Sequence, residues 1–322
     1  MAPRSHEVSY RIRHTTIYAY GDLVTLAHNE ARLNPRTGPW QVAHSARFVV
    51  EPAPAFMSRE LDYFGNWVHL FVLQEPHRRF ALTVHSEVTV RQPLLPHPEQ
   101  TMPWEDVRAL LLSATDHEVF EAVEYCYESP HVQWNDAIHQ YAAVSFTPRR
   151  PVLSAVLDLN SRIHRDFQYL PGVTNVATPV AAVFEQRSGV CQDFAHLLSA
   201  CVRSMGLSAR YVSGYLLTHP PEGQPRLVGA DASHAWASVY CPGHDFIDVD
   251  PTNNTLVNVE HPTLAWGRDF GDVSPLKGVV LGGGAHTVEV AVSVIPMDED
   301  SESDLATFSV HPDALDHGST DS

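Results

Sequence analysis

Residues 187–196 read Arg-Ser-Gly-Val-Cys-Gln-Asp-Phe-Ala-His, so a cysteine stands directly after a glycine turn and before an amphipathic apolar run. We expect a helix from about Cys191 to Met205, with Gly206 as its stop. A helix that begins at a cysteine directs its positive end at the sulfur, which stabilises a thiolate. Cys191 is therefore predicted to be a nucleophile rather than a buried apolar residue.

Two polar residues downstream suggest partners for this thiol. His234 begins a predicted strand after a polar turn, and Asp250 ends the next predicted strand. A thiol nucleophile needs a base, and the base needs a third group that fixes its tautomer. The short link between the two strands permits antiparallel pairing, which would bring His234 and Asp250 together. Because the chain has 20 histidines, spacing alone does not separate this triad from a core histidine and a turn aspartate.

Composition limits the partners and the compartment. The chain has 322 residues, 44% of them hydrophobic, and a formal net charge of −17. Phosphate binding requires clustered Lys and Arg, so this charge argues against nucleic acid and anionic membranes as partners. The sequence has no apolar run long enough to span a membrane, and residues 1–20 lack the pattern of a secretory signal. We expect a cytoplasmic protein with a peptide or protein substrate; the oligomeric state is left open.

The four cysteines do not predict a disulfide framework in a chain of this length. Cys201 lies in the middle of the predicted helix, Cys126 lies in a helical region, and Cys241 precedes a Pro-Gly turn. Cys241 and His244 have the spacing of metal ligands, but no second Cys/His pair lies near them in the sequence. We therefore expect neither a metal nor another cofactor.

Patterning divides the chain into three parts. From residue 8 to 91, alternation of apolar and polar residues predicts an antiparallel β-sandwich, and the proline-rich stretch 92–103 ends it. We place an N-terminal β-rich domain at residues 1–95 and a catalytic core at residues 96–297. The acidic tail, residues 298–322, lacks the spaced ligands of a calcium loop and is expected to be disordered.

Within the core, helical periodicity comes before strand patterns. Residues 104–168 are predicted to be helical, and Thr178-Pro179 is typical of the cap and first position of a further helix. Strands are then predicted over residues 209–216, 234–240, 246–250 and 287–294. Helices followed by antiparallel strands indicate an α+β fold, with the cysteine-bearing helix packed on an antiparallel sheet.

Four motifs in this order resemble the core of the bacterial transglutaminase-like family, which belongs to the papain-like thiol enzymes. They are Gly-Val-Cys-Gln-Asp-Phe-Ala (189–195), Tyr-Val-Ser-Gly-Tyr (211–215), Asp-Ala-Ser-His-Ala-Trp (231–236) and Asp-Pro-Thr-Asn (250–253). The N-terminal part resembles the strand-rich region that precedes this core, through residues 28–33 and 61–66. Residues 272–278 and 282–284 also fit, so the resemblance covers nearly the whole folded chain.

The resemblance implies that Cys191 is the nucleophile, His234 the general base and Asp250 the residue that orients the base. The backbone N–H of Cys191 is a natural oxyanion donor at a helix start. Further candidates for oxyanion or substrate contact are Gln192, Tyr169, Tyr215 and Trp236. Residues 237–246 depart from the family's usual Trp-x-Glu-Val-Tyr and Gly-x-Gly-Trp pattern, which leaves the choice of substrate open.

The predicted reaction is thiol-dependent acyl transfer through a thioester on Cys191. Water would resolve the thioester in a peptidase or amidase, and an amine would resolve it in a transglutaminase. The amine route requires a hydrophobic acceptor tunnel that excludes water, and no such tunnel can be recognised in the sequence. Hydrolysis is therefore favoured. The alternatives are a protein-glutamine transglutaminase, a non-catalytic binding module of the same fold, and acetyl transfer to arylamines.

Overall fold

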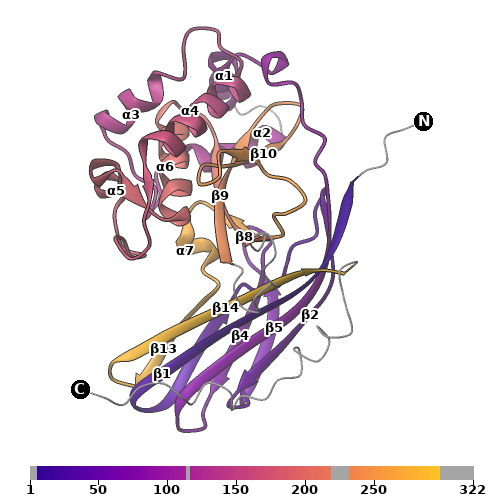
Figure 1. The fold of residues 1–322 in the computed structure, drawn as a ribbon, viewed down its shortest axis with the longest axis vertical. Helices are drawn as coiled ribbons and strands as arrows, with labels where there is room; N and C mark the ends of the chain where they lie inside the picture. The colour runs from indigo at the N-terminus through magenta and orange to yellow at the C-terminus, as the bar shows by residue number, and fades with distance from the viewer. Residues whose placement is uncertain (1–5, 114–116, 219–231, 298–322) are drawn as a thin grey trace, which may run out of the picture.

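The alternating residues near the N-terminus form one long strand, β1 (Glu7–Ala31), at the centre of a seven-stranded antiparallel sheet in the computed structural model (Figure 1). The structure describes residues 6–113, 117–218 and 232–297. The other strands of this N-terminal sheet are β2 (Gln41–Glu51), β3 (Phe56–Leu61), β4 (Trp67–Leu73), β5 (His77–Arg91), β13 (Leu276–Gly282) and β14 (His286–Pro296).

Six of these strands lie end to end in pairs. β1 runs antiparallel to β5 and then β4 along one side, and to β14 and then β13 along the other. β2 and β3 pair in the same way with β5 and β4. Three rows of the sheet each consist of two strands in succession, namely β5 with β4, β14 with β13, and β2 with β3. In β1 there is a register shift between Ala19 and Val24.

The C-terminal strands correct the predicted domain boundaries. Residues 276–296 lie in the N-terminal sheet and not in the catalytic core, because β13 and β14 both pair with β1. Gly282, Gly283 and Gly284 join them, all with positive φ (94°, 87° and 61°), a region that favours glycine. Among the described residues the predicted N-terminal sandwich is a single sheet, whose buried face packs on the core.

The core contains a second antiparallel sheet, which lies beside the helices and, in the view of Figure 1, above the N-terminal sheet. Its order is β11-β10-β9-β8-β12, from β8 (Ala209–Leu216), β9 (Ala232–Tyr240), β10 (Phe246–Asp250), β11 (Thr255–Leu256) and β12 (Thr263–Gly267). The predicted pairing of the His234 strand with the Asp250 strand is confirmed, with Val249 opposite Ala237. The α+β prediction is confirmed as well.

The helices cover this core sheet on one side. They are α1 (Trp104–Ser113), α2 (His117–Val123), α3 (Asp136–Ala143), α4 (Val152–Asp166), α5 (Val180–Gln186), α6 (Cys191–Ser204) and α7 (Phe270–Val273), with 3₁₀ turns η1 (Pro98–Gln100) and η2 (Glu124–Cys126). α6 is buried continuously from Asp193 to Arg203 and packs on β9. Its predicted start at Cys191 is confirmed, and Gly206 follows it with φ +74°. α5 begins one residue later than predicted, with Pro179 rather than Thr178 as its N-cap.

Two side-chain amides join the N-terminal region to the edge strand of the core sheet, β12. The Gln41 amide donates to the carbonyl of Thr263 and accepts from its N–H, both at 2.8 Å. The Asn66 amide donates to the carbonyl of Trp266 at 2.9 Å and accepts from its N–H at 3.0 Å. Each amide pairs with the backbone as a neighbouring strand would, so this edge is covered.

The two sheets also share one apolar cluster, which includes Tyr10 and Val84 of the N-terminal sheet and Tyr211 and Leu264 of the core. The core therefore cannot lose the N-terminal sheet without exposing part of its own interior. The predicted acidic tail lies outside the described residues. Among the described helices, none is both long and apolar enough to cross a membrane.

Candidate active site

A hydrogen-bonded turn fixes Cys191 as the first residue of α6. The Asp193 carboxylate accepts from the N–H of Val190 at 2.8 Å and from the Thr174 hydroxyl at 2.6 Å. This is the reciprocal half of a capping box, and Val190 itself offers no capping side chain. A Cβ on Gly189 would lie 2.7 Å from the Asp193 carboxylate, so the turn requires glycine there. The thiol thus stands at a rigid helix N-terminus, where the first N–H groups have no partner within the helix.

His234 and Asp250 meet on adjacent strands, β9 and β10. Asp250 Oδ2 lies 2.7 Å from His234 Nε2. Both side chains are buried, and Asp250 is fully so. Because Nε2 faces the carboxylate, Nδ1 is the ring nitrogen left for a partner on the other side of the imidazole. Cys191 lies close enough to His234 for its charge to raise the pKa of the imidazole. The structure therefore brings together the three residues predicted to form the triad.

The electrostatics favour a charged imidazole. Burial alone would lower the pKa of His234, but hydrogen bonds to Asp250 and Cys191, and their negative charges, outweigh it and raise the pKa to about 9. Burial would raise the pKa of Asp250, but its hydrogen bonds to His234, His261 and Asn253 hold that pKa well below its usual range. At neutral pH the pair is thus an imidazolium beside a carboxylate.

Sequence reasoning missed two side chains that hold Asp250. The Asn253 amide donates to Asp250 Oδ2 at 2.7 Å, and His261 Nε2 lies 3.4 Å from the same oxygen. The N–H groups of Thr252 and Asn253 donate to Oδ1 at 2.8 and 3.2 Å. The Asp-Pro-Thr-Asn motif could have suggested this Asx turn. His261 offers no such local signal, since nothing in its neighbourhood distinguishes it from the other histidines.

The same three groups are the one set of possible metal ligands found among the described residues. The ligand atoms of His234, Asp250 and His261 lie within 4.8 Å of one another, and all three residues are buried. Tetrahedral zinc with bonds of about 2.0–2.1 Å would hold two ligand atoms roughly 3.3 Å apart. The 2.7 Å between His234 and Asp250 is instead a hydrogen-bond length, so the arrangement fits a hydrogen-bonded network.

Two of the four further candidates lie beside the thiol. Tyr169 belongs to the two-residue strand β6 (Gln168–Tyr169), which pairs in parallel with β7 (Ser188–Gly189), just before Cys191. Burial raises the pKa of Tyr169, and the charge of Cys191 raises it further. Gln192 follows Cys191 in the first turn of α6 and is half-buried. Both residues remain candidates for contact with substrate.

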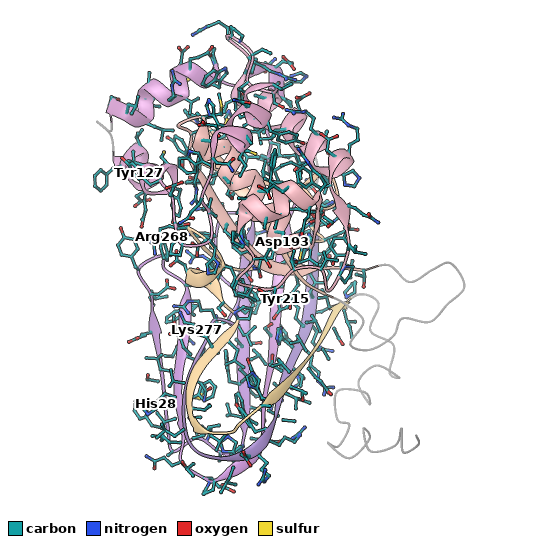
Figure 2. All side chains as sticks on the ribbon, turned by 90° about the vertical axis from the view of Figure 1, so that its left-hand side faces the viewer. His28, Tyr127, Asp193, Tyr215, Arg268 and Lys277 are labelled. Atoms are coloured by element: carbon teal, nitrogen blue, oxygen red, sulfur yellow. The ribbon has the colours of Figure 1, made fainter. Side chains whose placement is uncertain are left out.

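Tyr215 has a different environment. Its hydroxyl lies 3.1 Å from Nδ1 of His14, a residue of β1, and both side chains are buried. Burial lowers the pKa of His14 to about 4, so this contact is between neutral groups. Figure 2 shows Tyr215 below Asp193, where the core meets the N-terminal sheet. Tyr215 therefore joins two parts of the fold, and we do not assign it as an oxyanion donor.

Trp236 was a candidate for contact with substrate, but its side chain is fully buried and does not reach the surface. Its indole meets the His261 ring edge to face, with centroids 5.5 Å apart, and lies 6.0 Å from the His234 ring. A Cβ on Gly214 would lie 2.4 Å from this indole, which explains the glycine opposite His234 in β8. Trp236 thus forms the inner wall behind the two histidines.

The other three cysteines are expected to react slowly, because their thiols have raised pKa values. Burial raises the pKa of Cys126 and of Cys201 to about 12, and that of Cys241 to about 11. All four cysteines are free. At neutral pH these three thiols are therefore protonated and poorly nucleophilic.

Two family models match the chain. Residues 10–89 match the bacterial transglutaminase-like N-terminal region, and residues 140–251 match the transglutaminase-like superfamily. The second match ends one residue after Asp250 and includes Cys191 and His234. The first match ends before the described core begins, and neither includes strands β13 and β14.

Some similar proteins cover most of the chain, and others cover only part of it. An uncharacterized protein of Mycobacterium tuberculosis is 39% identical over 307 residues, which is 93% of this chain and 96% of the relative. A protein-glutamine gamma-glutamyltransferase of Pseudomonas aeruginosa is 33% identical over 92 residues, 28% of this chain and 14% of that protein. The fold is similar to that of a candidate cysteine protease from Cytophaga hutchinsonii, with TM-score 0.72, 21% identity and coverage of 92% and 93%.

Proposed function

Because the chain belongs to the transglutaminase-like superfamily, with the bacterial N-terminal region of that family, we propose that it transfers acyl groups through a thioester on Cys191. The substrate is a peptide or carboxamide, and hydrolysis is the reaction. The observation on which this proposal depends is the buried His234–Asp250 contact of 2.7 Å, and Cys191 lies near enough to raise the pKa of the same imidazole. The fold shared with a candidate cysteine protease agrees with it.

In the first half-reaction the Cys191 thiolate attacks the substrate carbonyl carbon. The N-terminus of α6 and the His234 imidazolium both stabilise the thiolate before attack. The carbonyl oxygen becomes an oxyanion, and the backbone N–H of Cys191 donates to it. His234 then gives its proton to the leaving amine as the C–N bond breaks. A thioester and a neutral imidazole remain.

In the second half-reaction neutral His234 takes a proton from water as the water oxygen attacks the thioester. The C–S bond breaks, the carboxylic acid leaves, and the thiolate–imidazolium pair is restored. Asp250 stays ionised throughout and holds the ring orientation, because its oxygens accept from His234, Asn253 and the turn backbone. If an amine replaced water, the product would be a new amide.

Amine transfer is the second candidate function. The local similarity to the Pseudomonas aeruginosa gamma-glutamyltransferase favours it, since the two proteins are 33% identical over 92 residues. The first half-reaction is the same for both outcomes, so the choice depends on which nucleophile reaches the thioester. Tyr169, beside the thiol, is half exposed, which leaves this side accessible to water.

The deciding experiment offers the purified protein a glutamine-containing peptide with and without a fluorescent primary amine. Ammonia release or peptide cleavage without incorporation of the amine is the result we expect. Incorporation of the amine would instead establish a transglutaminase. Cys191→Ala must abolish either product, and Cys126→Ala is the matched control. Acetyl-CoA with an arylamine should give no acetylated product.

A non-catalytic binding module predicts an ordinary thiol at position 191. Brief iodoacetamide treatment at pH 6, followed by peptide mass spectrometry, separates the two possibilities. We expect Cys191 to be alkylated first, because the pKa values of the other three thiols lie near 11 or 12. Equal labelling of Cys191 and Cys126 would contradict an activated thiolate.

We further propose that the protein acts in the cytoplasm on a peptide or protein, without nucleic acid or membrane as a partner. The net charge of −17 supports this, since it opposes binding to phosphate-rich surfaces. Four free cysteines agree with a reducing compartment. Cell fractionation with an antibody to the protein tests the location, and recovery in a membrane or periplasmic fraction would contradict it.

A further inference from the structure

The loop between α4 and α5 exposes several large apolar side chains next to the nucleophile. Tyr169, Leu170, Val173 and Val176 are 51%, 40%, 42% and 50% exposed. Single exposed apolar residues need no explanation, but a run of them along one loop marks a surface for binding. We call residues 169–178 the apolar loop.

The apolar loop is fastened to the turn that presents Cys191. At one end β6 pairs with β7, and the N–H of Leu170 donates to the carbonyl of Gly189 at 2.9 Å. Further along, the Thr174 hydroxyl donates to Asp193 in the first turn of α6. The Tyr169 ring also meets Phe194 of α6 edge to face, with centroids 6.4 Å apart. The loop is thus held at two points beside the helix start.

Charge sets this loop apart from the rest of the molecule. Residues 168–184 contain no Asp, Glu, Lys or Arg, although 18% of the chain is charged and its net charge is −17. Asp193, a carboxylate at its edge, is buried and already accepts two hydrogen bonds. A charged substrate group placed on this loop would lose hydration without finding an opposite charge within the loop itself.

We propose that the apolar loop is the recognition surface for the acyl side of the substrate, and that it selects an uncharged, apolar side chain next to the carbonyl attacked by Cys191. This rests on the proposed function, since it takes Cys191 as the nucleophile. The occupant is a segment of the substrate, because the loop is continuous with the turn before the thiol and its side chains lie at the surface. Burial of one such side chain favours apolar over charged groups by about 10- to 100-fold.

Peptidyl chloromethyl ketones test this without requiring turnover. The Cys191 sulfur displaces chloride and forms a C–S bond, and the intact mass reports the rate. Probes that differ only in the residue next to the ketone (Leu, Phe, Asp or Lys) are compared, each corrected for its rate with free cysteine. We expect Leu and Phe probes to label Cys191 about 10- to 100-fold faster. Equal corrected rates for all four probes would overturn the proposal.

Variants of the loop make the test specific. Val173→Asp and Val176→Asp should each reduce the preference for the Leu probe over the Lys probe by at least about fivefold. Leu112→Asp is the matched control, since Leu112 is an exposed apolar residue of α1 outside the loop, and it should leave the preference unchanged. Thermal melting of each variant confirms that it is folded. A preference unchanged in both folded loop variants would also overturn the proposal.

The outcome separates this inference from the proposed function. If no peptide is cleaved but apolar probes still label Cys191 faster, the proposed hydrolysis fails and the recognition surface stands. If peptides are cleaved with no preference for apolar residues, hydrolysis stands and the recognition surface fails.

Discussion

The two sides of the candidate site differ in how they are built. Around Cys191 the structure is open: the thiol is half-buried, and the loop beside it exposes Tyr169 and Leu170. Around Asp250 it is closed, with a fully buried carboxylate that accepts from His234, Asn253 and the turn backbone. The difference follows from their tasks. The substrate has to reach the nucleophile, so the thiol must be accessible. The interaction between the Asp250 carboxylate and His234 is stronger where water is excluded.

Removal of the thiol should have the largest effect on activity and little effect on stability. Cys191→Ala deletes the bond-forming atom, so we expect the rate of acyl transfer to fall by about 10⁶-fold. The side chain lies on the open side, so the melting temperature should stay nearly unchanged. Calorimetry measures the melting temperature, and a peptide-cleavage assay measures the rate. A large drop in melting temperature would show that the Cys191 side chain contributes to the packing of the core and would contradict this prediction.

Replacement of the buried Asp250 carboxylate by a neutral amide should lower the activity and narrow the pH range in which the protein is active. Asp250→Asn removes the charge that raises the pKa of His234 to about 9, and we expect kcat/KM to fall by roughly 10³- to 10⁴-fold. The alkaline limb of the pH profile should move from about 9 toward 6.5. An unmoved limb in the folded variant would contradict this assignment of the base.

The same pKa shift links pH to stability. Because the native pKa of His234 lies above its unfolded value, the ionised ring stabilises the fold below about pH 6.5. That contribution is lost as the pH rises through about 9. Denaturant melts of the wild type between pH 6 and 10 should show the loss, and Asp250→Asn should show little of it.

His261 should matter less than Asp250 and more than any exposed histidine. His261→Asn removes one ring beside Asp250 Oδ2 and opens space against Trp236, so we expect kcat/KM to fall by about 10- to 100-fold. The alkaline limb should stay near pH 9, because Asp250 keeps its charge and its hydrogen bonds with His234 and Asn253. A limb that moves toward 6.5 would contradict this. His244→Asn, on an exposed turn, serves as the control.

The smallest effect should come from the tether on the open side. Thr174→Val deletes the 2.6 Å hydrogen bond to Asp193, and we expect a loss of about two- to tenfold in kcat/KM for apolar substrates. Thr178→Val alters a hydroxyl of the same loop that accepts from Asn175 instead, so its loss should be smaller. Equal losses in both variants would show that the tether does not position the thiol.

Local patterns predicted the open side well. The glycine turn, the apolar periodicity and Gly206 determined where α6 begins and where it stops, because caps and helix faces are set by residues a few positions apart. Alternation determined β8 and β10 with their observed bounds. The closed side was predicted only in part. His234 and Asp250 could be proposed from strand patterns, but Asn253 and His261 could not.

Contacts between distant residues decided the rest. A strand pattern does not name its partner, so β14 could be predicted as a strand and still be assigned to the wrong domain. The amides of Gln41 and Asn66 look like ordinary polar residues until β12 is placed beside them. Trp236 and Tyr215 were candidates for substrate contact until their burial was known.

The sequence by itself determined that a thiol stands at the start of a helix, with a histidine and an aspartate on later strands. Those features depend on neighbours within a few residues, whose sterics and hydrogen bonds act locally. Only the tertiary structure decided that Asp250 is shared by two histidines, that the apolar loop is fastened beside the thiol, and that the last strands complete the first sheet. Each of these depends on packing between segments far apart in the chain, which no local pattern encodes.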